Sequence, residues 1–478
     1  MSVSLEAEVE GVDLGDQRLN RRLSKVITEL GKSPTLSIPA ATQGRAEMEA
    51  AYRFFDNPKV TPEKILEPHF EATRRRIAQR GFVLLTQDTS ELVLTRPNEQ
   101  VIGAGPMDSE ARRGAFFHPL MAFADDGIPL GIVWQKIWAR KSLHNNLTKK
   151  QRSQKRSQTP IQQKESIRWI EGIREAREVA RTCPETTCVC VCDSEADIYE
   201  AFIEPRKFVS DSGHEGELHL LIRARQRRAT QQNGDWFELL RGEACLYEGT
   251  AEVSPRSPQK IAPAKARKRN LPRTARIAQL EVRVKRVQLR PPYRPGKQLQ
   301  PTSVNLVLVE EVNTPQGAEP ICWLLATTLP IDTNEQVKKV VDSYCLRWQI
   351  EIFFRTVKSG CKIQQRYFET LDRLLNCVAV YSIVAWRVMY LCRMGRECPD
   401  MSCEVVFEPC EWKAVYKIFK REDPPKEPPT LNTIVRMVAV LGGFVDRKKN
   451  HPGTQTLWIG LQRLRDLAAA WSAFNKHK

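Results

Sequence analysis

Four polar side chains in the stretch 342–358, DSYCLRWQIEIFFRTVK, have types and spacings that suit chemistry on a phosphate group. They are Tyr344, Arg347, Glu351 and Lys358. At roughly 100° per residue in a helix, their directions fall within about 60° of one another and form one stripe. Apolar residues such as Trp348 and Ile350 fill the flanks of the stripe, which disfavours full solvation of Glu351. An acid between an arginine and a lysine therefore indicates phosphate chemistry; a ladder of intrahelical ion pairs is the alternative.

Two aspartates elsewhere follow apolar runs that have the character of buried strands. Asp88 comes near the end of GFVLLTQDTS, residues 81–90, and Asp193 follows CVCVC, residues 188–192. If the two strands are neighbours in one sheet, their carboxylates lie within a few Å, and a helix packed across the sheet adds Glu351. Three carboxylates without histidine suit Mg²⁺ or Mn²⁺ better than zinc. Two such ions, about 3.5 to 4 Å apart, activate a water or a 3′-hydroxyl and stabilise the leaving oxygen of a phosphodiester.

The cysteines at 188, 190 and 192 allow a different interpretation. Their alternation with valine predicts a buried strand with three thiols on one face, and cysteine is among the most buried residue types. A zinc site would want Cys-x2-Cys pairs or nearby histidines. A zinc-binding protein that uses this strand remains the minor alternative, since the chain is long enough to do without disulfides and the 13 cysteines are expected to be reduced.

The net charge points to a polyanionic partner. The chain has 478 residues, a formal charge of +17, and basic residues in every third of its length. Nucleic acid is the first candidate and an anionic membrane surface the second. No apolar run approaches the roughly 20 residues of a membrane span, and the acidic N-terminus lacks an apolar signal core. We therefore expect a cytoplasmic protein without a membrane partner.

The elements that must position these residues fall into three predicted domains. Residues 1–70 are predicted to form a helical DNA-binding domain, with Thr61 and Pro62 starting its third helix. Residues 71–370 form the catalytic domain, in which 116–124 and 130–139 read as a hairpin. A basic β-insertion at about 229–302 interrupts it, because proline, arginine and lysine rise there and the helical period is lost. Residues 371–478 are a helical C-terminal domain with enough apolar surface for dimerisation or for packing on the chain's own core.

The spacing Tyr-x2-Arg-x3-Glu-x6-Lys at 344–358, with QDTS around Asp88 and CDSEADIY around Asp193, resembles the signature of the insertion-sequence-four family of cut-and-paste transposases. Further segments, among them LGDQRLNRRL, LLIRARQRR and ICWLLATTLP, share the resemblance. It implies an α/β fold: an RNase H-like mixed-sheet core with an inserted β-subdomain, a helical N-terminal DNA-binding domain and a helical C-terminal domain.

The resemblance also assigns roles to single residues. It implies that Asp88, Asp193 and Glu351 are the catalytic acids and bind two Mg²⁺ or Mn²⁺ ions. It implies that Tyr344, Arg347 and Lys358 contact phosphates near the scissile bond, and that Arg223 contacts DNA. Trp323 matches a tryptophan that stacks on a flipped-out base, although ICWLLA also reads as a core strand. A flipped base costs a few kcal/mol, of which an aromatic face returns roughly 1 to 3.

The implied function is that of a bacterial DNA transposase, nucleoid-associated when bound to DNA. It would bind the terminal inverted repeats, cleave them by way of a hairpin and transfer the strands into target double-stranded DNA, as a homodimer in the synaptic complex. A nuclease without strand transfer and a transposase-derived DNA-binding regulator are the alternatives.

Overall fold

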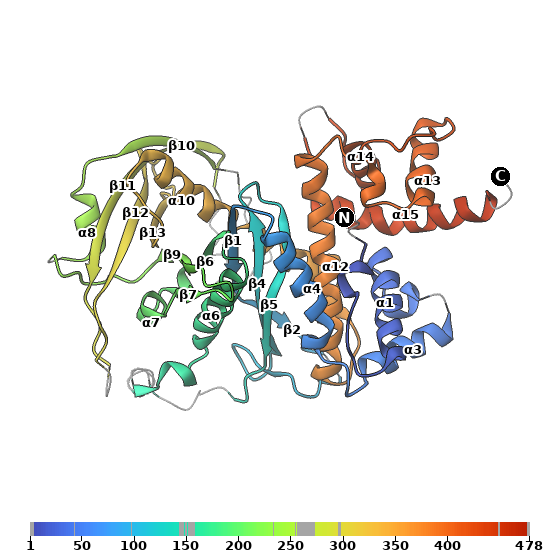
Figure 1. Cartoon of the computed structure of the whole chain (residues 1–478), viewed down its shortest axis with the longest axis horizontal. Helices are drawn as coiled ribbons and strands as arrows, with labels where there is room; N and C mark the ends of the chain where they lie inside the picture. Colours follow the sequence, from blue (N-terminus) through green and yellow to red (C-terminus); the bar gives the residue numbers. More distant parts are fainter. Residues whose placement is uncertain are drawn as a thin grey trace.

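The structure is a computed structural model that describes residues 4–42, 44–96, 98–142, 148, 151, 158–232, 234–253, 255, 273–294, 298–447 and 450–475. A mixed sheet with its helices occupies one half of the molecule, and helices alone form the other half (Figure 1). The part KARKRN of the predicted insertion lies outside the described residues.

The N-terminal segment folds into helices, as predicted. They are η1 (Ala7–Val9), α1 (Gln17–Lys32), α2 (Ile38–Ala41), α3 (Arg45–Phe55) and α4 (Pro62–Ile77). Thr61 caps α4, because its side chain accepts a hydrogen bond from the backbone N–H of Lys64, and Pro62 occupies the first turn. The helix α4 runs past residue 70 and packs on β5 and on α12, so it links the N-terminal helices to the sheet.

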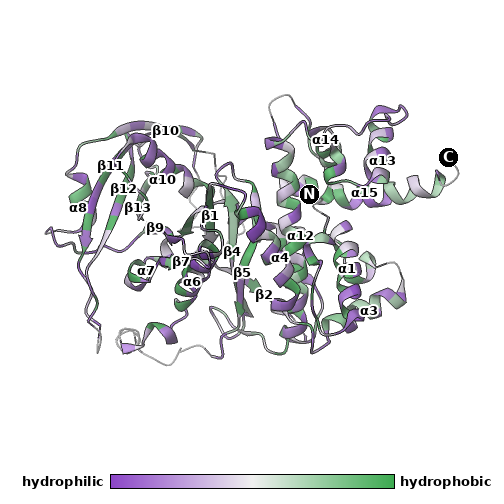
Figure 2. Cartoon of the chain, viewed as in Figure 1, coloured by the Kyte–Doolittle hydropathy of each residue, from purple (hydrophilic) through white to green (hydrophobic). Residues whose placement is uncertain are grey.

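The sheet carries the core of the catalytic half. In the described part of the chain its strands are β1 (Phe82–Gln87), β2 (Ser90–Val93), β3 (Gly105–Pro106), β4 (Arg113–Ala124), β5 (Pro129–Trp138), β6 (Thr187–Cys192), β9 (His219–Ala224), β10 (Tyr247–Val253), β11 (Arg276–Leu289), β12 (Thr302–Val312) and β13 (Cys322–Thr327). Their order is β10-β11-β12-β13-β9-β6-β1-β4-β2, with β3 and β5 also paired to β4. The pairs β1–β6 and β6–β9 are parallel. The central strands β1 and β4 are strongly hydrophobic (Figure 2).

The insertion does not form a separate sheet. Its strands β10 and β11 pair with each other, and β11 pairs with β12 of the core, so they extend the central sheet. Between them and β9 lies a short helix, α8 (Trp236–Arg241), whose Trp236 is buried. A two-stranded ribbon, β7 (Lys207–Val209) with β8 (Glu215–Glu217), stands apart from the main sheet.

Helices cover the sheet and make up the C-terminal part. They are α6 (Ile167–Thr182), α7 (Tyr199–Ile203), α10 (Asn334–Leu346), α11 (Gln349–Arg355), α12 (Leu371–Glu397), α13 (Pro409–Lys420), α14 (Leu431–Leu441) and α15 (Thr454–Phe474). The helix α12 is long and apolar enough to cross a membrane, yet 83% of its most apolar stretch is buried in the protein. The helix α12 is therefore a core helix of the protein. Its Asn376 donates to the carbonyls of Phe55 and Val60, which ties α12 to the N-terminal helices.

Candidate active site

Two parallel strands bring the predicted aspartates to the same edge of the sheet. In the register of β1 with β6, Gln87 pairs with Cys192, and Asp88 and Asp193 are the next residues on each strand. The carboxyl ends of adjacent parallel strands meet at one edge, so both carboxylates emerge side by side. The prediction from the apolar runs is confirmed in this respect.

The stretch 342–358 is not the single regular helix that the spacing predicts. The helix α10 ends at Leu346, Arg347 and Trp348 form a tight turn with hydrogen bonds to residues three positions earlier, and α11 follows. A π-helical turn, Thr356–Gly360, then carries Lys358. These shorter-range hydrogen bonds interrupt the regular helix between Arg347 and Glu351, which periodicity alone does not reveal.

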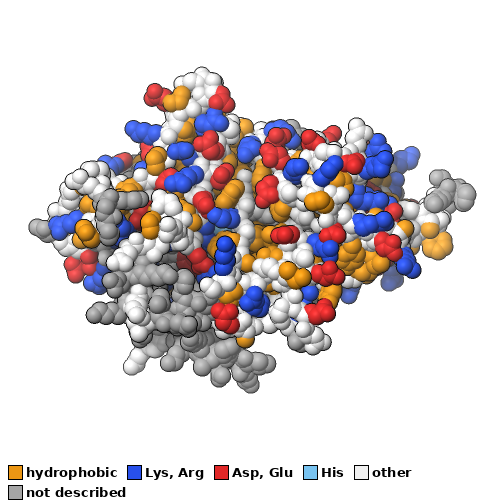
Figure 3. Space-filling view, turned by 90° about the horizontal axis from the view of Figure 1, so that it is seen from below, with side chains coloured by type: hydrophobic (Ala, Val, Ile, Leu, Met, Phe, Trp, Pro, Cys, Tyr) orange, Lys and Arg blue, Asp and Glu red, His pale blue; other side chains and the backbone are white. Residues whose placement is uncertain are grey.

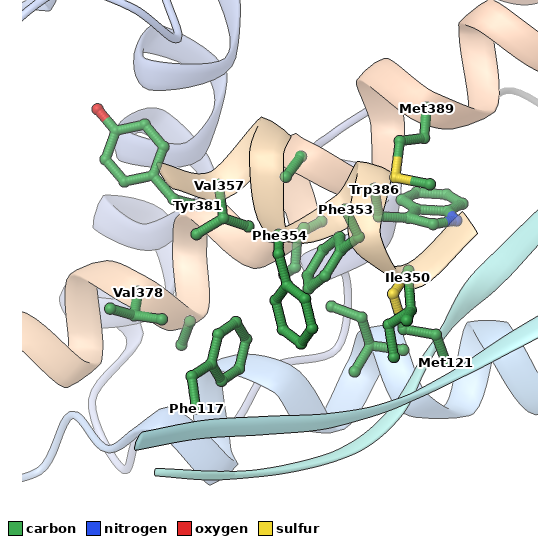
Figure 4. Close-up of a cluster of buried hydrophobic side chains, with 14 of the residues drawn as sticks. Phe117, Met121, Ile350, Phe353, Phe354, Val357, Val378, Tyr381, Trp386 and Met389 are labelled. Atoms are coloured by element: carbon green, nitrogen blue, oxygen red, sulfur yellow. The ribbon is translucent and has the colours of Figure 1, made fainter. Parts of the chain in front are cut away.

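The apolar face of α11 fixes the position of Glu351. Ile350, Phe353 and Phe354 are buried, and the two phenylalanine rings lie 6.1 and 5.9 Å from the ring of Phe117 on β4. Figure 4 shows these side chains packed between β4 and α12. Glu351 remains 41% exposed, because it projects away from this apolar cluster.

Arg347 joins two of the three acids. Its Nη1 lies 2.9 Å from Asp88 Oδ2 and 3.8 Å from Glu351 Oε1, and its side chain is only 9% exposed. Tyr344 donates from its hydroxyl to Asp193 Oδ1 at 3.4 Å. The structure thus brings all three predicted acids to one place, with a guanidinium between Asp88 and Glu351.

The surroundings of Asp88 perturb its acidity. Burial, together with the nearby charges of Glu351 and Asp193, raises its pKa from the ordinary value of 3.8 to about 7. The guanidinium of Arg347 and a hydrogen bond from the backbone N–H of Thr89 lower it in part. A carboxylate in this position gains from any cation that it contacts.

Four of the predicted DNA contacts line one groove beside the acids. The groove has a volume of about 1010 Å³, and its walls include Arg223, Trp323, Tyr344 and Arg347. The ring of Trp323 meets that of Tyr344 edge-on at 5.9 Å, so Trp323 is at the site and only partly a core residue. Trp348 was expected on the apolar flank, but it is 63% exposed and lines the same groove.

Lys358, the fifth predicted contact, is absent from the residues that line this groove. Burial lowers the pKa of its ammonium, while the charges of Glu91 and Glu351 raise it. Lys358 therefore remains electrostatically connected to the site through Glu351.

The donor set fits a hard divalent cation by its chemistry. Asp88, Asp193 and Glu351 supply only oxygen atoms, as Mg²⁺ and Mn²⁺ prefer. Among the residues that the structure describes, no group of three His, Cys, Asp or Glu side chains is already spaced as metal ligands. The charge of Arg347 lies instead between Asp88 and Glu351. A metal here would require this guanidinium to give up the oxygen of Asp88.

The cysteine strand behaves as a packing element. Cys188, Cys190 and Cys192 are buried in β6, and burial raises the pKa of the Cys188 and Cys192 thiols above the ordinary value. Zinc binds the thiolate, which this environment disfavours.

Further polar residues surround Asp88, and the sequence did not predict their contacts. Gln87 and Thr89 flank Asp88 and contact His118 and Arg168, which come from β4 and α6. In the sequence, only the QDTS motif pointed to Gln87 and Thr89, and no motif pointed to His118 or Arg168.

Comparison with known proteins gave three family models that match successive parts of the chain. They are "Transposase DNA-binding" at residues 1–60, "Transposase DDE domain" at 171–382 and "Transposase Tn5 dimerisation domain" at 383–472. Asp193 and Glu351 lie in the second range, and Asp88 lies before it. Among solved structures, one similarity is to a piggyBac transposase synaptic complex with hairpin DNA, at 9% identity and a TM-score of 0.36, covering 99% of this chain and 73% of the other.

Proposed function

This chain belongs to the Tn5-type family of DDE transposases, and we propose that Asp88, Asp193 and Glu351 are its catalytic acids. The observation that carries the assignment is their convergence: two strand-end aspartates lie at one sheet edge, and Arg347 connects the first of them to Glu351. Transposase and polynucleotidyl transferase activity follow from the family. The roles of single residues and the course of the reaction are our proposal.

The three acids are proposed to hold two divalent cations, Mg²⁺ or Mn²⁺. When bound, these ions activate the attacking oxygen and stabilise the leaving oxygen of a phosphodiester. The carboxylates provide the ligands, and α11 keeps Glu351 in place by burying its apolar face against β4 and α12.

Arg347 is proposed to exchange partners when DNA binds. Arg347 forms an ion pair with Asp88, and a phosphate oxygen would offer its guanidinium an equally favourable charged acceptor. Tyr344, Lys358 and Arg223 would contact neighbouring phosphates, and Trp323 would stack on a flipped base in the groove that it lines. Arg347 thereby leaves the carboxylates free when the substrate is in place.

The proposed reaction begins with hydrolysis at the transposon end, which frees a 3′-hydroxyl. This hydroxyl attacks the opposite strand, forms a hairpin and releases the flanking DNA. Water opens the hairpin, and the regenerated 3′-hydroxyl attacks target DNA. Each joining step forms one P–O bond and breaks another, so no energy source beyond the phosphodiester is needed.

The proposed assembly is a homodimer on two transposon ends in the bacterial cytoplasm, at the nucleoid. The C-terminal range that matches the dimerisation model exposes the apolar side chains of Ile418 and Phe419, and Phe474, just after this range, is exposed as well. Apolar surface of this kind is suited to a subunit interface. Target double-stranded DNA would join the complex after cleavage.

A joining assay tests the proposal against a nuclease without strand transfer. The substrate is a duplex made from the inverted repeat that flanks the reading frame, already cut to expose its 3′-hydroxyl, with Mg²⁺ and a second duplex. A transposase joins the two, whereas a nuclease does not.

Substitution of the acids tests the triad against a DNA-binding regulator. Asp88→Asn, Asp193→Asn and Glu351→Gln are each expected to abolish cleavage and to leave binding of the end duplex intact. Asp342→Asn, on the exposed side of α10, is the matched control. Cleavage that survives all three substitutions contradicts the assignment, and a wild-type chain that binds but never cleaves supports the regulator.

A further inference from the structure

A continuous chain of buried hydrogen bonds runs behind Asp88. Gln87 donates from its amide to the carbonyl of Trp169, at 3.3 Å, so its Oε1 is free to accept from His118 Nε2 at 2.9 Å. The other ring nitrogen, His118 Nδ1, lies 2.8 Å from the hydroxyl of Thr89 and must then accept from it. Each bond in the chain has one possible direction, with a neutral His118.

The neutral form of His118 agrees with its surroundings. The side chain is fully buried, with Trp134 and Trp169 edge-on to its ring at 5.9 and 4.8 Å. Burial lowers the pKa of His118 well below its ordinary value, and the charges of Arg168 and Lys136 lower it further. The network is therefore held in one protonation state, and it presents the Thr89 oxygen as an acceptor.

Arg168 connects this network to the loop of the second aspartate. Its Nε donates to Thr89 Oγ1 at 2.7 Å, and its Nη2 donates to Glu195 Oε2 at 2.6 Å. Thr89 directly follows Asp88, and Glu195 lies two residues after Asp193. Arg168, whose side chain is 12% exposed, thus spans the segments that carry both aspartates with one planar guanidinium.

The Asp193 loop has an anchor of its own. Asp197 is buried and accepts from the backbone N–H groups of Arg225 and Gln226 at 2.7 and 2.6 Å, and it pairs with Arg228 at 2.6 Å. Arg168 itself is steadied by Trp169, whose ring lies 5.3 Å from its guanidinium carbon. Arg168 thus ties Thr89, which lies between the strands β1 and β2 that both pair with β4, to the anchored loop of Asp193.

We propose that Arg168 is a positioning residue that sets the separation of Asp88 and Asp193 through Thr89 and Glu195. This role rests on the proposed function, in which Asp88 and Asp193 bind a divalent cation, and it concerns how the two carboxylates are placed for that cation. Arg168 touches neither carboxylate in the structure's hydrogen bonds, and it acts through the residues beside them. Residues that orient metal ligands typically change metal affinity or activity by about 10- to 100-fold when they are replaced.

Loss of the charge of Arg168 and loss of its positioning role would change the binding of a cation in opposite directions. Removal of the positive charge of Arg168 alone would strengthen the binding of a cation nearby, whereas loss of positioning would weaken it. Two variants separate these effects. Arg168→Lys keeps the charge but cannot span both loops with one planar fork, and Thr89→Val changes no charge at all. Arg174→Lys is the matched control, since Arg174 lies in the same helix and makes an equivalent ion pair to Glu204 at 2.6 Å.

The experiment measures the dissociation constant of Mn²⁺ by electron paramagnetic resonance, with the full chain bound to its end duplex, and the Mn²⁺ concentration for half-maximal cleavage. We expect both values to rise about tenfold or more in Arg168→Lys and in Thr89→Val. End binding in EDTA should stay the same, excess Mn²⁺ should restore cleavage, and Arg174→Lys should match the wild type.

Two results overturn the inference. One is an unchanged Mn²⁺ dissociation constant in both variants. The other is a loss of cleavage that excess Mn²⁺ does not restore and that accompanies weakened end binding, because this indicates a role in folding alone. A wild-type chain that binds its end duplex without cleaving it contradicts the proposed function instead, so the two failures are distinguishable.

Discussion

Trp323 offers a test of the groove at the scale of a single side chain. Its ring lies against Tyr344 and lines the groove beside the acids. Base stacking on an aromatic ring is worth about 1 to 3 kcal/mol, or roughly 5- to 150-fold in rate. Trp323→Ala should therefore slow hairpin formation by this factor and leave the first nick unchanged, as a denaturing gel can show. Trp323→Phe should retain most of the rate, and equal loss of nicking and hairpin formation would refute a stacking role.

Glu8 gives a pH-dependent contribution to stability. It accepts from His69 Nδ1 at 2.5 Å and from Arg76 at 2.8 Å. Burial raises its pKa, but these hydrogen bonds and charges together lower it from 4.5 to about 2. A lowered carboxyl pKa stabilises the fold above its unfolded value, and the contribution is lost as pH falls from about 4.5 towards about 2.

The expected contribution of Glu8 at neutral pH is about 3 kcal/mol of unfolding free energy. Glu8→Gln should lose a comparable amount at pH 7, and its difference from the wild type should shrink as the pH falls through this window. Urea denaturation at a series of pH values measures it, with Glu10→Gln, an exposed neighbour, as the control. A difference that does not change with pH contradicts the argument.

At the scale of elements, the π-helical turn Thr356–Gly360, which follows α11, packs against the C-terminal helix α15. A Cβ added to Gly360 would lie 2.8 Å from the ring of Trp458 on α15. Overpacking of this kind costs about 1 to 3 kcal/mol. Gly360→Ala should lower the melting temperature measured by calorimetry and, because Lys358 shares the turn, weaken binding of the end duplex. Gly81→Ala, whose Cβ would meet no atom within 4 Å, should change neither property.

The sequence predicted the elements that depend on local pattern. An apolar run that ends in an acid places Asp88 and Asp193 at strand ends, and the cap at Thr61 fixes the start of α4. The sequence did not predict the break at Arg347 and Trp348. The backbone of both residues stays close to helical values, and the stripe of polar residues continues across the break.

The local sequence pattern could not predict contacts between residues that lie far apart in the chain. Thr89 and Arg168 are 79 residues apart, and nothing in either neighbourhood specifies the other. Likewise, β10 and β11 were expected as strands of an inserted β-subdomain, and their alternation shows that they are strands but not that they extend the core sheet. The three acids were predicted from their local contexts together with the family resemblance, whereas the hydrogen-bond network beside Asp88 became visible only in the fold.

At the scale of the whole molecule, the positive charge is distributed and partly neutralised. On the face shown in Figure 3, basic and acidic side chains are interspersed. In the N-terminal helices, Arg22 and Lys25 both pair with Glu47, at 2.5 and 2.6 Å. Arg18 and Arg21, on the same helix α1, are exposed. A basic side chain paired with a glutamate is therefore less available to a phosphate backbone than an exposed, unshared one.

The salt dependence of end binding should reflect the difference between the paired and the exposed basic side chains of α1. Each phosphate neutralised by a cationic side chain contributes about −0.9 to the slope of log K against log salt on duplex DNA. Arg18→Ala and Arg21→Ala should each reduce the magnitude of the slope by roughly one. Arg22→Ala should reduce it less, because Arg22 must first be released from Glu47, and so it serves as the matched control. Filter binding or fluorescence anisotropy between 50 and 200 mM salt measures all three slopes. Equal slopes in the wild type and in the Arg18 and Arg21 variants would place the phosphate contacts on another surface. The domain that matches the DNA-binding model would then bind the end duplex through residues outside the exposed face of α1.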